Sequence, residues 1–274
     1  MTLSDAEARR FREHGYAVAP RFFGEHEVAA IRAELERLVR DGRLRNVTTE
    51  GDGVTRSRTA RNLQLCPMSP ISPLFRAMPF DDKVVRAVRR LIGDPVVLHL
   101  DQVFLKPARH GVGTSWHQDN AYFRIDDPLL GTAMWIAVHD ATLANGTLHL
   151  VPDCFAEPLE HARDAYSDHH IRCWPPEERA VAIELPAGGA VFFAYGTPHC
   201  TKANETDRER AGAALHFLNG SAVGPGYFGA DGPMKHPALS GPSADGGRGA
   251  YGADLRGVWE REVDRALWDY RASR

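Results

Sequence analysis

The feature that most constrains the fold of this chain is its central region, from about residue 95 to about 220, where short apolar runs replace helical periodicity. The runs are rich in β-branched and aromatic residues and are separated by residues typical of turns. Strands at this spacing predict a sandwich or barrel rather than alternating strand and helix units. The runs are PVVLHLDQVFLKP, TAMWIAVHDAT, GTLHLVP, AVAIELPAGGAVFFAYG and ERAGAALHFLN, and the glycines of LPAGGAVFF predict a hairpin-like turn.

Amphipathic helices are predicted before this region. Ser4 followed by Glu7 is the pattern of a capping box, for a short helix that runs to Gly15. Apolar residues at helical spacing predict further helices within 24–42 and 81–93, each followed or ended by a glycine.

Helical spacing returns within 254–270, after a Gly/Pro-rich tract (223–252) that predicts a long loop. We find no internal repeat. We therefore expect a single domain over residues 1–274, with N-terminal helices at about 4–93, a β-rich core at about 95–220, and a loop and C-terminal helix at about 221–274.

Composition limits the class of protein. The 274 residues are 43% hydrophobic and 25% charged, with a formal net charge of -3, which gives no basic footprint for nucleic acid or a membrane surface. No run approaches the roughly 18 apolar residues of a membrane span, and the N-terminal segment lacks the apolar core of a signal peptide. We expect a cytoplasmic monomer or small homo-oligomer that acts on a small molecule. The four cysteines, Cys66, Cys154, Cys173 and Cys200, form no C-x-x-C pair and are expected to be free thiols.

The stretch TSWHQDNAYF carries the most specific chemistry. On a strand, His117 and Asp119 would project from the same face because side chains alternate with period two. Taken alone, an H-x-D pair is more often an exposed polar pair. His199, just after the run AVFFAYG, can supply a third ligand. Two histidines and one carboxylate form the facial triad of non-haem Fe(II) oxygenases, which leaves coordination positions open.

These motifs resemble the phytanoyl-CoA dioxygenase family of Fe(II)- and 2-oxoglutarate-dependent oxygenases, over nearly the whole chain. HQDNAYF resembles the first metal motif of that family, WIAVHDATLANGTLHLVPDCF its central strand pair, and TPHCTKANETDRERAG its second metal motif. The resemblance implies a double-stranded β-helix, or jelly-roll, and implies that His117, Asp119 and His199 bind the iron. The implied cofactors are Fe(II), 2-oxoglutarate and O2.

The resemblance also implies a site for 2-oxoglutarate. Arg210, eleven residues after His199, would hold the distal carboxylate, since a planar guanidinium can grip a carboxylate through two hydrogen bonds. Arg208 has the same strand parity, so only the spacing favours Arg210, and a surface arginine is the alternative reading. Thr201 would place a hydroxyl near the same carboxylate.

Two further cosubstrate contacts are implied with less support. Trp135 would wall the cosubstrate and Gln102 would line it, against the alternative of ordinary strand packing. His216 shares the strand face of Arg210 if the strand is regular and could then reach the pocket, but we interpret it as a satisfied core histidine. His169 and His170 lie in a segment that could cover the site. Arg56, Arg58 and Arg61 form a small basic cluster that could meet an anionic substrate or be a solvated loop.

The expected reaction is hydroxylation of an unactivated C–H bond of a metabolite or natural-product intermediate, with release of succinate and CO2. Asp119 favours this outcome over halogenation, because related halogenases replace the carboxylate with a small residue. Desaturation, epoxidation and ring formation stay open. So does a different class, a non-oxidative cupin-like isomerase or metal-binding protein, which would have no use for Arg210 beside the metal.

Overall fold

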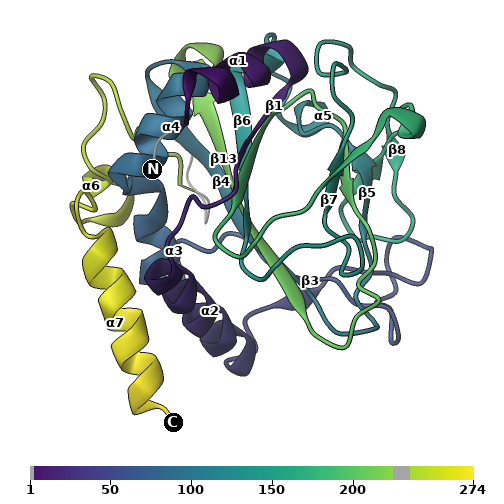
Figure 1. The fold of residues 1–274 in the computed structure, drawn as a ribbon, viewed down its shortest axis with the longest axis horizontal. Coiled ribbons are helices and arrows are strands. Elements are labelled where there is room, and N and C mark those ends of the chain that lie inside the picture. The colour runs from purple at the N-terminus through teal and green to yellow at the C-terminus, as the bar shows by residue number, and fades with distance from the viewer. Residues whose placement is uncertain (1–2, 225–234) are drawn as a thin grey trace.

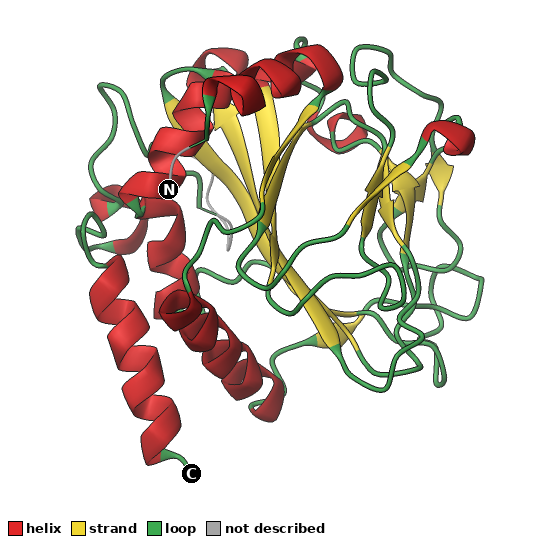
Figure 2. Ribbon diagram, in the orientation of Figure 1, coloured by secondary structure: helices red, strands yellow, loops and turns green. Residues whose placement is uncertain are grey.

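The structure, a computed structural model, describes residues 3–224 and 235–274. Two antiparallel β-sheets face one another, and helices cover the outer face of the larger sheet (Figure 1 and Figure 2). The expectation of a mainly β core with flanking helices is confirmed.

The larger sheet contains seven strands and the smaller one four. The seven are β1 (Tyr16–Ala19), β2 (Arg45–Asn46), β3 (Leu63–Leu65), β4 (Val96–Lys106), β6 (Gly131–Ala137), β11 (Ala190–Ala194) and β13 (Arg210–Asn219), in the spatial order β1-β11-β6-β13-β4-β3-β2. The four are β5 (Thr114–His117), β7 (Leu148–Leu150), β10 (Val181–Ile183) and β12 (His199–Thr201), in the order β10-β7-β12-β5. A separate pair is formed by β8 (Ala162–Arg163) and β9 (Ile171–Arg172).

The helices have recognisable sequence signals at their ends. They are α1 (Asp5–His14), α2 (Glu25–Arg40), α3 (Pro73–Ala77), α4 (Asp82–Ile92), α5 (Asn120–Phe123), α6 (Arg248–Tyr251) and α7 (Trp259–Ala272). The Ser4 side chain caps α1 by accepting a hydrogen bond from the backbone N–H of Glu7, and Gly15 ends it in a left-handed conformation. The reciprocal half of the capping box is absent, because the Glu7 carboxylate accepts from the N–H of Val18 in β1.

Alternation along the central strands separates two apolar cores. In β6, Met134 and Ile136 pack with the helices, whereas Ala133 and Trp135 pack between the sheets. Every residue of β6 is consequently buried, as expected for a strand covered on both faces.

Two predictions of local structure are wrong. The turn in LPAGGAVFF does not close a hairpin, because β10 belongs to the small sheet and β11 to the large one. Gly188 allows this crossover: its φ is 85°, and a Cβ there would lie 2.5 Å from the carbonyl oxygen of Phe23. The C-terminal helix begins at Trp259 rather than near 254, because Gly257 adopts a φ of 65°.

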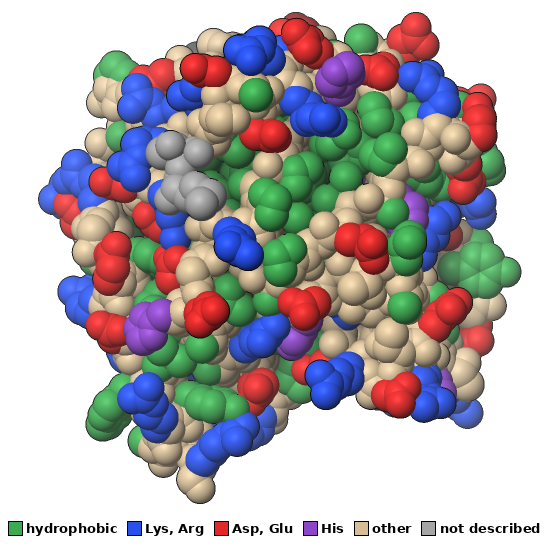
Figure 3. Space-filling model, in the orientation of Figure 1, with side chains coloured by type: hydrophobic (Ala, Val, Ile, Leu, Met, Phe, Trp, Pro, Cys, Tyr) green, Lys and Arg blue, Asp and Glu red, His purple; other side chains and the backbone are tan. Residues whose placement is uncertain are grey.

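The predicted loop 223–252 lies partly outside the described residues, and its described part contains the short helix α6. No helix in the described ranges has both the length and the apolar character needed to cross a membrane. Side chains of both charge signs are interspersed over the face shown in Figure 3.

Gly212 in β13 is a specific requirement of this packing. A Cβ at this position would lie 2.5 to 2.7 Å from atoms of the Trp135 indole, so glycine lets the ring lie against the strand. We expect Gly212→Ala to lower the free energy of unfolding by about 1–3 kcal/mol through overpacking, measured by urea denaturation. Gly224→Ala is the control, since a Cβ there meets no atom of the described residues within 4 Å. Equal stability of the two variants would contradict close packing of Trp135 on Gly212.

Candidate functional site

A cavity of about 400 Å³ lies between the two sheets. Period-two alternation builds much of its wall: β4 contributes Leu100, Gln102 and Phe104, and β13 contributes Ala214 and His216. The other lining side chains are largely aromatic or imidazole, and they include Tyr122, Phe123, Trp135, His169, His170 and Phe193. A cavity of this size and character fits a small organic molecule.

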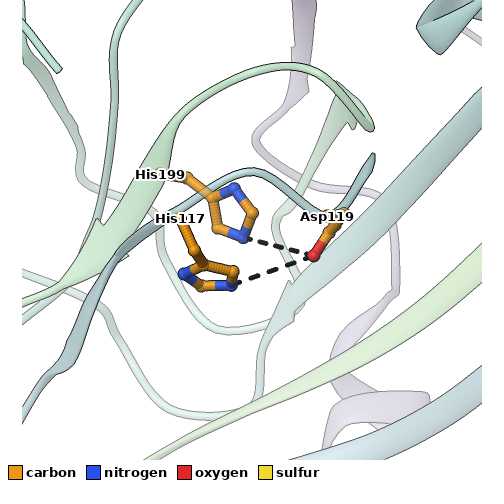
Figure 4. A group of neighbouring side chains, drawn as sticks. All are labelled: His117, Asp119 and His199. Atoms are coloured by element: carbon orange, nitrogen blue, oxygen red, sulfur yellow. Dashed lines mark ion pairs between the residues drawn. The ribbon is translucent and has the colours of Figure 1, made fainter. Parts of the chain in front are cut away.

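His117, Asp119 and His199 meet at this cavity (Figure 4). His117 ends β5 and His199 begins β12, and the two are register partners in the small sheet. The Nε2 atoms of both histidines lie 3.8 Å from the Asp119 Oδ1, and one potential ligand atom from each residue lies within 4.8 Å of the others. Residues far apart in sequence therefore present three ligand atoms to one point.

Asp119 reaches this point by a route that strand alternation does not provide. The strand β5 ends at His117, and Asp119 has helical backbone angles (φ -58°, ψ -33°) at the start of α5. The expectation that H-x-D lies on one continuous strand is wrong. A strand that turns into a short helix brings the carboxylate to the imidazoles.

Backbone contacts orient both imidazoles. The Nδ1 of His117 lies 2.8 Å from the carbonyl of Ser115, and the Nδ1 of His199 lies 3.0 Å from the carbonyl of Thr197. A carbonyl only accepts, so each Nδ1 carries the proton and each Nε2 offers its lone pair to the centre. Burial lowers the pKa of His117 to about 4 and that of His199 well below its usual value, so both are neutral, as metal ligands must be.

Asp119 is a buried carboxylate without a cationic partner among the described residues. Burial raises its pKa to about 8, and its Oδ2 has no hydrogen-bond partner in the structure. A divalent cation would supply the missing positive charge. The donor set of two neutral imidazoles and one carboxylate therefore fits Fe(II) on its chemistry.

Two buried cations lie beside the cavity. Arg210 and Lys106 are register partners in β13 and β4, and each is 1% exposed. Arg210 donates to the carbonyls of Asn145 and Gly146, and Lys106 donates to those of Gly146 and Lys202. No carboxylate in the described part of the chain pairs with either cation, and burial lowers the pKa of both.

Lys106 is a buried lysine that the sequence analysis did not single out, and it is not itself part of the cavity wall. Its signal is readable afterwards: in DQVFLKP it stands in phase with Gln102 and Phe104, so it points to the face that they share. A lysine on the inner face of a buried strand is unusual, since the charge loses its hydration.

Arg210 is not itself part of the cavity wall. Its guanidinium carbon lies 5.6 Å from the centroid of the Trp135 ring, and that ring does line the cavity. Thr201 also lines the cavity, and its hydroxyl accepts a hydrogen bond from the N–H of Thr114. Gln102 lines it too, with its amide between Gln64 and His216.

The interpretation of His216 as a satisfied core histidine is wrong. His216 lines the cavity, and its Nδ1 is buried without a hydrogen-bond partner, 3.5 Å from the Oδ2 of Asp119. Burial lowers its pKa to about 3, so the ring is neutral. The sequence did indicate this position, because His216 and Arg210 are an even number of residues apart on the same strand and therefore share a face.

The segment around His169 and His170 covers part of the cavity. Both imidazoles line it, and the ring of His170 stacks parallel to that of His117 with centroids 6.3 Å apart. Tyr122 in α5 accepts a hydrogen bond from the N–H of Ile171, which ties this segment to the helix after the H-x-D motif.

The predicted basic cluster is not part of the cavity wall. Arg45 lines the cavity instead, and it is ion-paired with Asp168. Asn120, which directly follows Asp119, holds the backbone of Ile125 through both ends of its amide. All four cysteines are free, and Cys66 and Cys200 line the cavity.

Comparison with known proteins places the chain in a family. The model of the family described as phytanoyl-CoA dioxygenase (PhyH) matches residues 11–212. An ectoine dioxygenase of Bordetella parapertussis is 24% identical over 238 residues, covering 78% of this chain and 75% of that protein. One from Streptomyces avermitilis is 26% identical over 260 residues, covering 87% of this chain and 86% of that protein.

Solved structures share the fold. The carbocyclase SnoK from nogalamycin biosynthesis superposes with a TM-score of 0.67 at 22% identity, covering 79% of this chain and 84% of that one. EctD from S. alaskensis, solved with 2-oxoglutarate and 5-hydroxyectoine, gives a TM-score of 0.65 at 22% identity, covering 93% and 86%. The jelly-roll expectation is confirmed. The chain belongs to the phytanoyl-CoA dioxygenase family and is a non-haem oxygenase that uses Fe(II), 2-oxoglutarate and O2.

Proposed function

We propose that this oxygenase hydroxylates an unactivated C–H bond of a small-molecule metabolite or natural-product intermediate, with release of succinate and CO2. The observation that carries the proposal is a charge imbalance around one aromatic cavity. A buried carboxylate between two imidazoles lacks a cation, and two buried cations nearby lack an anion. Fe(II) would supply the cation for Asp119, and the dianion 2-oxoglutarate would supply the anion for the two buried cations.

The residues proposed to hold the iron are His117, Asp119 and His199, through the two Nε2 atoms and Asp119 Oδ1. When bound, iron and 2-oxoglutarate supply the oxidising chemistry, in which O2 drives decarboxylation of 2-oxoglutarate and oxidation of the C–H bond. The protein contributes by fixing three ligands on one side and leaving the other side to the cavity.

We propose that Arg210 and Lys106 anchor the distal carboxylate of 2-oxoglutarate, with the Thr201 hydroxyl as a further contact. Both cations are held by backbone carbonyls, so their positions are set before a ligand arrives. Trp135 lies between the cavity and this region and would pack against the aliphatic part of the cosubstrate. Gln102 is left out of this proposed cosubstrate site, because its amide nitrogen contacts His216.

The cavity wall favours a substrate with a substantial apolar part. Phe104, Tyr122, Phe123 and Phe193 surround the space next to the triad, and such walls exclude water from a reactive centre. Polar groups of Gln64 and His169 stand in the same wall and could hold a polar end of the substrate. Relatives named for ectoine, a small molecule, support this substrate class.

Other outcomes of the same chemistry stay within reach of this site. Structures of similar fold include a carbocyclase and an epimerase, so ring formation and epimerisation are alternatives that product analysis would identify. Retention of Asp119 argues against halogenation. Membership of the phytanoyl-CoA dioxygenase family disfavours the non-oxidative cupin-like alternative.

Assembly of the proposed site can be followed by its visible spectrum. We expect the metal-free protein, titrated anaerobically with Fe(II) and then 2-oxoglutarate, to develop the visible charge-transfer band of an iron-bound 2-oxoglutarate chelate. Asp119→Ala should abolish the band by removing a metal ligand. Arg210→Ala should weaken apparent 2-oxoglutarate affinity by about 10- to 100-fold, the equivalent of about 1.5–3 kcal/mol for charge-assisted hydrogen bonds.

Arg208→Ala is the matched control, since Arg208 is the competing arginine of the same run. Binding of iron without a band in the wild type would refute the 2-oxoglutarate site. Equal losses for Arg208→Ala and Arg210→Ala would refute the assignment of Arg210.

Burial of the Lys106 ammonium group should lower the stability of the ligand-free protein. Because its ammonium group is buried beside Arg210 without an anion, Lys106→Met should raise the free energy of unfolding of the ligand-free protein by about 1–3 kcal/mol. The same change should weaken 2-oxoglutarate binding by about tenfold. Urea denaturation and the titration above measure the two effects.

Lys202→Met makes the same chemical change on a side chain that is 47% exposed, and it should alter stability little. A destabilised Lys106→Met protein would mean that the two carbonyl contacts of Lys106 outweigh its desolvation. Unchanged 2-oxoglutarate affinity would remove Lys106 from the anchor.

A further inference from the structure

A chain of polar side chains leads from the sheet to the unsatisfied oxygen of Asp119. It starts at Gln64 in β3, whose Nε2 donates to the Oε1 of Gln102 in β4 at 2.9 Å. The Gln102 oxygen is thereby used as an acceptor, so the other end of its amide, Nε2, faces His216. The two Nε2 atoms, of Gln102 and of His216, lie 3.2 Å apart.

This contact determines which nitrogen of His216 carries the proton. An amide nitrogen can only donate, so the Nε2 of His216 must accept. In a neutral imidazole the proton then resides on Nδ1. That Nδ1 lies 3.5 Å from the Oδ2 of Asp119, and neither atom makes a hydrogen bond with the residues that the structure describes.

The two oxygens of Asp119 are consequently divided between two tasks. Oδ1 faces the Nε2 atoms of His117 and His199, at 3.8 Å from each, whereas Oδ2 faces His216. Catalytic hydrogen bonds are often long before ligands bind, and a small rotation of the carboxylate would close this one. The ring of Phe123, at right angles to the imidazole with centroids 5.5 Å apart, helps to fix its plane.

We propose that His216 is a positioning residue that holds Asp119 as a one-oxygen metal ligand, and that Gln102 and Gln64 select the tautomer of His216 required for this. The inference rests on the proposed role of the triad in binding iron. It reassigns Gln102 from a contact of 2-oxoglutarate to a member of the chain behind the metal ligand. A carboxylate held through one oxygen leaves more coordination positions for cosubstrate and O2 than one that chelates the metal.

The test uses the affinity of the metal-free protein for Co(II) alone, measured anaerobically by calorimetry, together with the visible spectrum of the Co(II) protein. His216→Phe keeps a planar ring but removes the donor, and should weaken Co(II) binding by about 10- to 100-fold, as is usual when a partner of a metal ligand is lost. Its spectrum should change, because a released carboxylate alters the coordination. His216→Asn places an amide N–H near the former Nδ1 and should restore affinity and spectrum to near wild-type values.

Gln102→Met tests the reassignment of the amide. It should weaken Co(II) binding less than His216→Phe does, because the tautomer is no longer fixed but the imidazole remains. The affinity for 2-oxoglutarate, measured at saturating metal, should not change. A loss of 2-oxoglutarate affinity with unchanged Co(II) binding would return Gln102 to the cosubstrate site and overturn this part of the inference.

Two controls separate a structural effect from a positioning effect. His149→Phe changes a histidine of the neighbouring strand β7 that does not line the cavity, and should leave Co(II) binding unchanged. Thermal unfolding of the metal-free variants should show that His216→Phe is at least as stable as the wild type, since an apolar ring replaces an unsatisfied polar atom. If His216→Phe were both unstable and weak in Co(II) binding, its weak binding would indicate misfolding. Normal Co(II) binding by His216→Asn would then show that a hydrogen-bond donor at this position is what metal binding requires.

The inference is overturned if His216→Phe binds Co(II) as the wild type does, or if His216→Asn is as weak as His216→Phe. Failure of the proposed function has a different signature. In that case the wild type itself would bind no metal through the triad, and Asp119→Ala would behave as the wild type does.

Discussion

Desolvation of charge is the constraint on which this structure depends. Packing two sheets face to face removes water from Asp119, Lys106 and Arg210, and none of these groups finds an opposite charge among the described residues. Burial of such groups disfavours their charged forms and opposes folding, so that it raises the pKa of Asp119 and lowers those of Lys106 and Arg210. Apolar burial on both faces of the large sheet provides the compensating stability. The protein therefore maintains, at a cost to its own stability, an electrostatic pattern complementary to a cation and an anion.

Strand pairing positions some of the side chains around the cavity, and a change of backbone direction positions Asp119. Strand pairing places His117 opposite His199, and the register of β13 with β4 places Arg210 opposite Lys106. Asp119 is set differently, by the change from strand to helix just after His117. Backbone carbonyls hold the imidazoles and the cations, whereas the second oxygen of Asp119 is approached by the His216 side chain. Of the three side chains in the cluster, Asp119 is therefore the one that lies next to a further side chain, His216, rather than a backbone carbonyl.

Local patterns in the sequence predicted much of this arrangement. Apolar periodicity located the long helices, turn residues delimited the strands, and the motifs around His117 and His199 predicted the cluster that these histidines form with Asp119. Sheet membership was not predictable, because the glycines before β11 are equally compatible with a hairpin and with a crossover between sheets. Lys106 was not singled out, and His216 was interpreted as a satisfied core histidine, for a related reason. Their importance depends on which groups face them across strands distant in sequence, and single-strand parity does not give that pairing. Asp119 does lie in the predicted cluster, but the reason given for it was wrong, because no continuous strand carries both His117 and Asp119.

The separation of the two apolar cores has a consequence for how such proteins diverge. Along β4, β6 and β13, alternate positions serve either the helical layer or the cavity, and few side chains serve both. Substitutions on the cavity side can accumulate under selection for a new substrate while the helix-facing positions preserve foldability. EctD from S. alaskensis, which is 22% identical in sequence, retains the fold over 93% of this chain. A scaffold partitioned in this way is well suited to functional innovation, since variation in specificity and conservation of stability fall on opposite sides of the same strands.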